Sequence, residues 1–77
     1  RDAGIGELFD AAILRVGKPI REMNKADRLR VIEQLKSMDA FSYRRAVPYV
    51  ANHLGVSRYT VYKYLDEVSA KEQKEEH

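Results

Sequence analysis

The chain contains no cysteine. Disulfide bonds and thiolate metal sites are therefore excluded, and the composition is consistent with a reducing compartment. No apolar run approaches the roughly 18 residues that a membrane span needs, and no basic segment precedes an apolar one as in a signal peptide. We therefore expect a cytoplasmic protein that has no membrane partner.

Acidic residues are missing from one long segment. Residues 40–65 carry four basic side chains and no acidic one, whereas residues 1–39 carry eight basic and seven acidic side chains, and residues 66–77 carry two and five. A segment of this kind can face phosphate groups without repulsion, which favours a nucleic-acid partner. Tyr49 and Tyr64 are expected to lie largely in the core. All five tyrosines fall inside the acid-free segment: Tyr43, Tyr49, Tyr59, Tyr62 and Tyr64.

Two stretches in the first half show the apolar spacing of helices. Residues 1–16 are predicted to form an amphipathic helix of about three turns. Gly17 and Pro19 end this pattern, and we interpret residues 17–23 as a linker. The chain begins at Arg1 without a methionine, so this helix could lead out of an upstream domain, form a dimer seam or close the core. The apolar residues that define it are Ile5, Leu8, Phe9, Ala12, Ile13 and Val16.

The next helix is expected from Lys25 to about Met38, because Asn24 and Asp27 resemble a capping box at its start. Pro48 is tolerated only in the first turn of a helix, so the following one is expected from about Val47 to Leu54. A final helix is predicted from Arg58 to about Val68. Residues 69–77 are almost wholly charged, and we expect them to form a flexible tail.

Between residues 50 and 65 the sequence meets the demands of the helix-turn-helix, a unit that lays its second helix in the DNA major groove. Apolar residues recur one turn apart in each helix, a glycine supplies the left-handed turn, and a serine hydroxyl can cap the second helix. We predict an all-α fold, a small helical bundle in which residues 24–68 form a three-helix core. The key positions are Val50, Leu54, Gly55, Ser57, Val61 and Leu65.

Polar residues of the second helix of this unit are predicted to face outward. Arg58, Tyr59 and Lys63 are the expected contacts to base edges, because the N-terminal end of such a helix usually enters the groove. Hydroxyl groups favour phosphate oxygens, and these contacts position a domain without reading sequence. The predicted hydroxyl contacts to phosphate come from Ser57, Thr60 and Tyr62.

Two further basic pairs are candidates for DNA contact. Arg44 and Arg45 precede a helix whose dipole favours an anion, so they are predicted to bind phosphate; a solvated pair is the alternative. Lys18 and Arg21 flank Pro19 and resemble the arms of invertase-type recombinases, which enter the minor groove. An ordinary interdomain linker explains the same residues.

The sequence shows no pattern typical of catalysis or metal binding. His53 has no cysteine or neighbouring histidine, so we expect a surface imidazole, no metal site and no cofactor. Neither a Ser/His/Asp arrangement nor a phosphate-binding glycine loop occurs. We therefore expect a protein that is not an enzyme.

One combination of motifs points to a family. It consists of Gly17-Lys18-Pro19, the Leu35-to-Phe41 spacing, Ala46-Val47 with Val50-Ala51, and Leu54-Gly55-Val56-Ser57-Arg58 with Thr60-Val61-Tyr62-Lys63-Tyr64-Leu65. From about Leu8 to Val68 the chain thereby resembles the C-terminal helix-turn-helix domain of YheO/DauR-like bacterial transcription regulators. The resemblance implies a sequence-specific regulator with an upstream PAS-like domain that senses a small molecule. Pro48 and Asp39 depart from the family pattern. A helix former is expected at position 48 and a glycine at position 39.

Three hypotheses follow. The first is a DNA-binding domain of a bacterial transcription regulator, acting on double-stranded DNA as a homodimer that pairs through the N-terminal helix or the upstream domain. The second is the DNA-targeting domain of a recombinase or transposase. The third is a protein-interaction module, which would not bind duplex DNA in a salt-dependent way.

Overall fold

The computed structural model describes residues 4–75, which fold entirely into helices and short connections. Residues 1–3 and 76–77, the outer ends of the predicted first helix and of the predicted tail, lie outside the described residues. No strand occurs within residues 4–75, and the predicted all-α bundle is confirmed. The helices in chain order are α1 (Ile5–Val16), η1 (Ile20–Glu22), α2 (Lys25–Ser37), η2 (Ala40–Ser42), α3 (Ala46–Leu54) and α4 (Arg58–Glu75), of which η1 and η2 are 3-10 helices.

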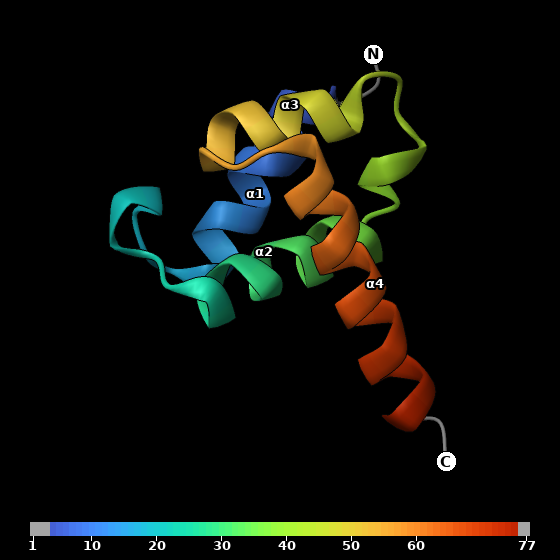
Figure 1. Ribbon diagram of the computed structural model, residues 1–77. Coiled ribbons are helices and arrows are strands. Elements are labelled where there is room, and N and C mark those ends of the chain that lie inside the picture. The colour runs from blue at the N-terminus through green and yellow to red at the C-terminus, as the bar shows by residue number, and fades with distance from the viewer. Residues whose placement is uncertain (1–3, 76–77) are drawn as a thin grey trace.

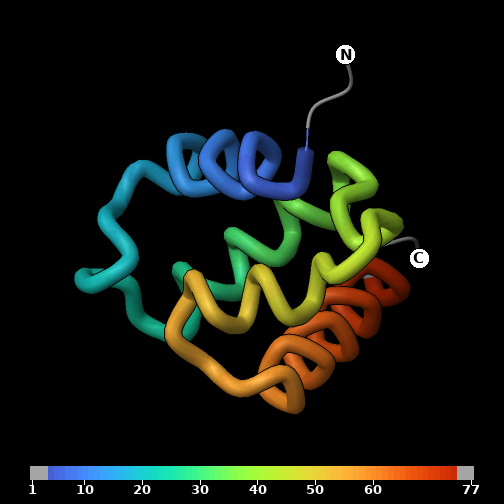
Figure 2. The backbone as a smooth tube through the Cα atoms, turned by 90° about the horizontal axis from the view of Figure 1, so that it is seen from above, coloured from blue at the N-terminus to red at the C-terminus, as the bar shows by residue number. Residues whose placement is uncertain are grey.

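Helix α2 is the centre of the bundle. Both α1 and α4 pack against it, and α3 contacts α1 and α4. Seen from above, α1 and α4 lie on opposite sides with α2 and α3 between them (Figure 2). The C-terminal half of α4 extends beyond the other helices (Figure 1). The side chains that fill the centre are fully buried and come from three helices: Val31, Ile32 and Leu35 of α2, Val50 of α3 and Val61 of α4.

The two predicted helix boundaries in the first half are confirmed. Gly17 ends α1 in the left-handed region with φ 81°, where its N–H donates to the carbonyl of Ile13. At the start of α2, the Asn24 side chain accepts from the N–H of Asp27 at 2.9 Å, and the Asp27 carboxylate accepts from the N–H of Asn24 at 3.1 Å. This reciprocal pair is a capping box with aspartate at its third position.

The connection from α2 to α3 contains two non-glycine residues in the left-handed region, Asp39 with φ 59° and Arg45 with φ 61°. Asp39 therefore adopts the backbone conformation for which glycine was expected. Helix α3 begins at Ala46, one residue before the predicted start, and Pro48 lies in its first turn as predicted. The proline removes no helical hydrogen bond there, because the first N–H groups of a helix have no intrahelical acceptor.

The turn between α3 and α4 has the predicted form. Gly55 has φ 74°, and its N–H and that of Val56 both donate to the carbonyl of Ala51. Ser57 caps α4, because its Oγ accepts from the N–H of Thr60 at 3.1 Å. Along α4 the next buried position after Val61 belongs to Tyr64 rather than to Leu65, which is only half-buried.

The predicted end of the last helix at Val68 is wrong, since α4 continues to Glu75 and residues 69–75, which were assigned to the tail, are helical. Lys36 of α2 donates to Ser69 Oγ at 2.9 Å and lies 2.6 Å from the Glu72 carboxylate. Lys71 pairs with Glu33 at 3.4 Å. The segment also lacks glycine and proline, which favours continuation of the helix. Its charged side chains, which were expected to be solvated, extend the contact with α2.

Within residues 4–75 no helix combines the length and the apolar character needed to cross a membrane. The same part of the chain contains no group of three or more histidine, cysteine, aspartate or glutamate side chains placed to hold a metal ion.

Candidate nucleic-acid interface

The outward face of the first two turns of α4 carries the four residues predicted from the helical spacing. Arg58, Tyr59, Tyr62 and Lys63 are all exposed, Tyr59 at 71% and Tyr62 at 56%. Tyr59 and Lys63 lie opposite the buried Val61, because residues two positions away on either side point in nearly opposite directions at 3.6 residues per turn. The face therefore presents two cations and two aromatic rings to solvent at the end of the helix that follows the turn.

Hydroxyl groups at the start of α4 serve the helix itself. Ser57 Oγ lies 2.9 Å from Thr60 Oγ1 and also accepts the backbone N–H of Thr60. Ser57 remains exposed and Thr60 is half-buried. The pair holds the first turn of α4 in place, and the N–H groups of that turn are oriented outward with the positive end of the helix dipole.

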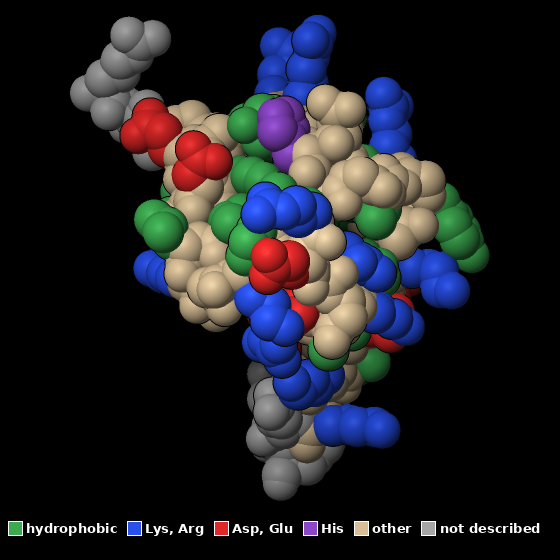
Figure 3. Space-filling model, turned by 90° about the vertical axis from the view of Figure 1, so that its left-hand side faces the viewer, with side chains coloured by type: hydrophobic (Ala, Val, Ile, Leu, Met, Phe, Trp, Pro, Cys, Tyr) green, Lys and Arg blue, Asp and Glu red, His purple; other side chains and the backbone are tan. Residues whose placement is uncertain are grey.

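Arg44 and Arg45 lie on the surface immediately before α3, as predicted, and both are exposed. Arg45 is the residue that precedes the first turn of α3, and no side chain caps that helix end. Helix α3 lies at the top of the molecule in Figure 1. In the space-filling view, Lys and Arg side chains project from this end, and no Asp or Glu lies directly beside them (Figure 3). Positive charge therefore lies at the start of α3, where the N–H of Ala46 already donates to the carbonyl of Tyr43 and Pro48 has no N–H.

Ion pairing divides the basic residues of the molecule into two groups. Those that face α2 or the distal half of α4 have acidic partners: Lys25 with Glu67 at 3.2 Å, Lys36 with Glu72, Lys71 with Glu33, and Arg30 with Asp27. Within residues 4–75 no ion pair includes Arg44, Arg45, Arg58 or Lys63. The four cations around the helix-turn-helix thus have no acidic partner within residues 4–75 and are free to meet an external anion. Arg15, Arg28 and Lys74 also lack an ion pair there, although Arg15 and Arg28 donate hydrogen bonds to other side chains or the backbone.

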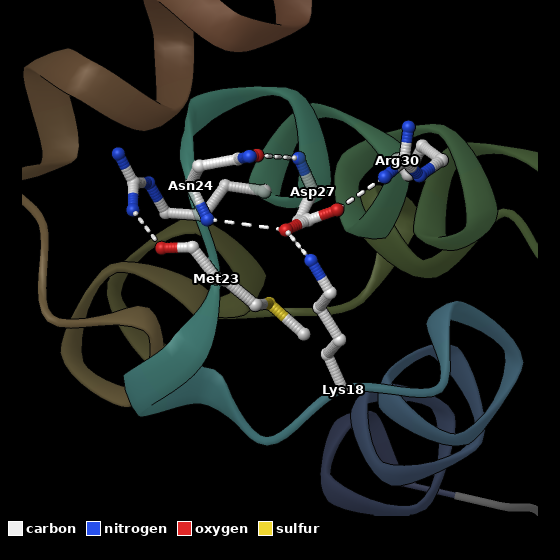
Figure 4. A network of polar contacts seen from close by, with 6 residues as sticks. Lys18, Met23, Asn24, Asp27 and Arg30 are labelled. Carbon is white, nitrogen blue, oxygen red and sulfur yellow. Dashed lines mark hydrogen bonds and ion pairs between the residues drawn. The ribbon is translucent and has the colours of Figure 1, made fainter.

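The corner between α1 and α2 separates the two residues predicted as a minor-groove arm. Lys18 Nζ lies 3.0 Å from Oδ2 of the buried Asp27, so its ammonium group is directed into the bundle (Figure 4). Arg21 is exposed and lies 3.9 Å from Glu22. To reach DNA, Lys18 would have to leave a buried carboxylate that would then keep only Arg30 as a cationic partner.

Asp27 is the buried centre of this corner, a role that sequence analysis missed. Its side chain accepts from Lys18, from the N–H of Asn24 and from Arg30 (Figure 4). The hydrogen bond from Lys18 and then that from Asn24 lower the pKa of the carboxyl group, against the opposing effect of burial. The capping-box pattern marked Asp27 as the N3 residue, but nothing in the spacing indicated that Lys18 would reach it.

A second missed contact holds α4 against the start of α2. Arg28 Nε donates to the hydroxyl of the buried Tyr64 at 3.1 Å, and Arg28 also donates to the carbonyl of Met23 at 3.0 Å. The hydroxyl of Tyr64 is thereby satisfied inside the core, whereas no hydrogen bond is formed within residues 4–75 by the hydroxyl of Tyr59. Arg28 therefore sets the position of α4 at the turn next to its exposed face.

His53 lies on the surface of α3, as predicted. Its ring stacks on Tyr49 with a centroid distance of 3.8 Å, and Tyr49 in turn packs edge-on against the buried Phe9 of α1. Nδ1 of His53 lies 2.9 Å from the carbonyl of Tyr49, one turn earlier in the helix. The imidazole therefore packs against the junction between α1 and α3.

Comparison with known proteins supports the assignment that the geometry suggests. A search of curated proteins and of solved structures found no match. A family model described as an HTH domain matches residues 5–66, which include α1, α2, α3 and the first half of α4. This fold is chiefly used to bind DNA. Since the match covers most of the chain, the protein belongs to the HTH domain family, in which α3 and α4 form the helix-turn-helix.

Proposed function

We propose that this chain is the sequence-specific DNA-binding domain of a bacterial transcription regulator. The observation that supports the proposal most directly is that Arg58 and Lys63, which have no ion pair within residues 4–75, lie on the exposed face of the first two turns of α4. In the proposed complex the first two turns of α4 enter the major groove, where Arg58, Tyr59 and Lys63 contact base edges. Arg58 offers the planar donor pair that suits a guanine.

Phosphate contacts flank this helix in the proposal. Arg44 and Arg45 lie at the start of α3, and the hydroxyl groups of Ser57, Thr60 and Tyr62 lie along the edge of the recognition face. Contacts of this type fix the register of a domain on the duplex and make binding strongly dependent on salt. Lys18 has no place in this interface because its ammonium group is bound to Asp27.

We further propose that the domain acts as a homodimer on two half-sites, because one module contacts few base pairs. Leu14 on α1 is 81% exposed, the largest exposed fraction among the described large apolar side chains, which makes α1 the favoured surface for pairing within this chain. The motifs shared with YheO/DauR-like regulators support an upstream sensing domain as a second dimer contact and the bacterial cytoplasm as the setting.

The proposal is tested by comparing the DNA binding of two double variants. One removes two cations that have no ion pair within residues 4–75, and the other removes two cations that have one. Replacement of Arg58 and Lys63 by alanine should weaken binding to the preferred duplex and reduce its advantage over a random duplex, because both side chains are assigned to base edges and the salt slope is set by the phosphate contacts. Lys25→Ala with Lys71→Ala removes the same charge from two lysines that are paired with Glu67 and Glu33. This control variant should keep most of the affinity and the slope.

Two results would contradict the proposal. Equal losses in both double variants would mean that only net charge matters and that α4 is not the reading helix. Wild-type protein that binds no duplex at low salt, although circular dichroism shows it folded, would favour the protein-interaction hypothesis.

A further inference from the structure

Large apolar side chains are exposed at few places on the described part of the molecule. They are Leu14 on α1 and Tyr59 and Tyr62 on α4. The aromatic contacts of residues 4–75 join only Phe9, Tyr49 and His53, so neither exposed tyrosine packs against another ring. Two of the three exposed apolar groups therefore lie on the face that also carries unpaired cations.

Tyr59 is the more exposed of the two tyrosines and is the second residue of α4. Arg58 precedes it, and Lys63 follows one turn later on the same face. A ring at this place reaches the floor of the groove when the N-terminal end of the helix enters it. Tyr62, one turn farther along, lies closer to the edge of the groove, where phosphate oxygens are the available acceptors.

The major groove offers one apolar group to such a ring. Guanine, cytosine and adenine display only hydrogen-bond donors and acceptors there, whereas thymine also displays its C5-methyl group. An aromatic ring that is 71% exposed in the free protein gains most by covering an apolar group, and the phenol oxygen remains at the ring edge for water.

We propose that Tyr59 packs its ring on the methyl group of a thymine, so that the half-site contains a thymine beside the base pair read by Arg58. The proposal rests on the proposed function, because it assumes that α4 lies in the major groove. It assigns specificity to the ring of Tyr59 rather than to its hydroxyl group.

The test uses the whole chain and a duplex selected from a random pool by binding. Each thymine of the selected site is replaced singly by deoxyuridine, which removes only the methyl group. At one position the replacement should weaken wild-type binding by about fourfold, the effect of one buried methyl-sized group. Tyr59→Phe should keep this loss, and Tyr59→Ala should abolish it, because no ring remains to contact the methyl group.

Tyr62→Ala is the matched control, because it removes the second exposed ring of the same helix. It should weaken binding to the thymine and deoxyuridine duplexes by the same factor, which leaves the fourfold difference intact. Disappearance of the difference in Tyr62→Ala, or its persistence in Tyr59→Ala, would overturn the assignment to Tyr59.

The failure of this inference can be told apart from the failure of the proposed function. A selected site at which no deoxyuridine replacement changes affinity overturns the thymine contact while DNA binding stands. A pool in which no sequence is enriched, together with a flat salt dependence, overturns both proposals. Equal binding of single-stranded and duplex competitors also overturns the thymine contact, since stacking on unpaired bases needs no methyl group.

Discussion

The carboxylate of Asp27 shows how one residue can join distant parts of the chain. It belongs to the capping box of α2 and also binds the ammonium group of Lys18 from the preceding corner. Since its pKa lies below the ordinary value of 3.8 in the folded protein, the ionised form is stabilised by folding. The contribution is therefore fully present above the unfolded-state pKa and is lost as the pH falls through the lower folded-state pKa.

This sign gives a prediction for Asp27→Asn. The variant should be less stable than wild type at pH 7, because Lys18 and Arg30 lose their anionic partner. The difference in the free energy of unfolding should shrink as the pH falls below 3.8, because the unfolded wild-type chain then takes up a proton that the folded protein takes up only at its lower pKa. Urea unfolding between pH 7 and pH 3 measures it. A difference that stays constant or grows with acid would contradict the role of the ionised carboxylate.

At the scale of the element, the start of α3 combines backbone strain with positive charge. Arg45 has φ 61°, a left-handed conformation that costs a residue with a side chain about 1–2 kcal/mol. No hydrogen bond or ion pair of the Arg45 side chain occurs within residues 4–75. A side chain that stabilises nothing in the free domain and occupies a strained position is typical of a functional residue.

Arg45→Gly should therefore move stability and binding in opposite directions. Glycine removes the energetic cost of the left-handed conformation, but it also raises the conformational entropy of the unfolded chain, which offsets part of the gain. The free energy of unfolding should therefore rise by up to about 1 kcal/mol. Loss of a phosphate contact should at the same time lower DNA affinity and reduce the salt slope by about 0.9. Thermal unfolding and a salt titration on the same sample check both. Arg44→Gly is the control, and it should lower stability because the φ angle of Arg44 is not in the left-handed region. An unchanged DNA affinity in Arg45→Gly would show that Arg45 does not contact DNA.

Helix α4 marks the limit of prediction from the sequence. Its start followed from Gly55 and the Ser57 cap, both of which act within a few residues of the boundary. Its end did not, because the ion pairs and hydrogen bonds that accompany its last two turns reach Lys36 and Glu33, more than thirty positions away. From its sequence alone a charged segment is expected to be solvated. Its contacts with another helix appear only in the folded structure.

The same reason explains which parts of the candidate interface were predictable. Exposure of Arg58, Tyr59 and Lys63 follows from helical periodicity, which a sequence shows directly. The partner of Lys18 and the tether between Arg28 and Tyr64 depend on how helices pack, and residue spacing says nothing about them. Long-range polar contacts thus decided which basic residues are free for DNA.

For the molecule as a whole, charge and apolar surface are arranged on different helices. Four exposed cations without an ion pair within residues 4–75 lie before α3 and at the start of α4, three ion pairs join α2 to α4, and an exposed leucine lies on α1. Figure 2 shows α1 on the far side of the bundle from α4. Two copies that pair through α1 would therefore leave both recognition helices accessible, as binding to two half-sites requires.

This arrangement predicts the effect of Leu14→Lys. Because Leu14 is 81% exposed, the fold should be unaffected, while a charge on the pairing surface should oppose self-association. Sedimentation over a concentration series should show a weaker dimer, and affinity should fall for a duplex with two half-sites but not for one with a single half-site. Ala70→Lys adds the same charge at an exposed position of α4 and should leave both unchanged. A wild-type chain that remains monomeric at every concentration would instead assign dimerisation to a region outside α1.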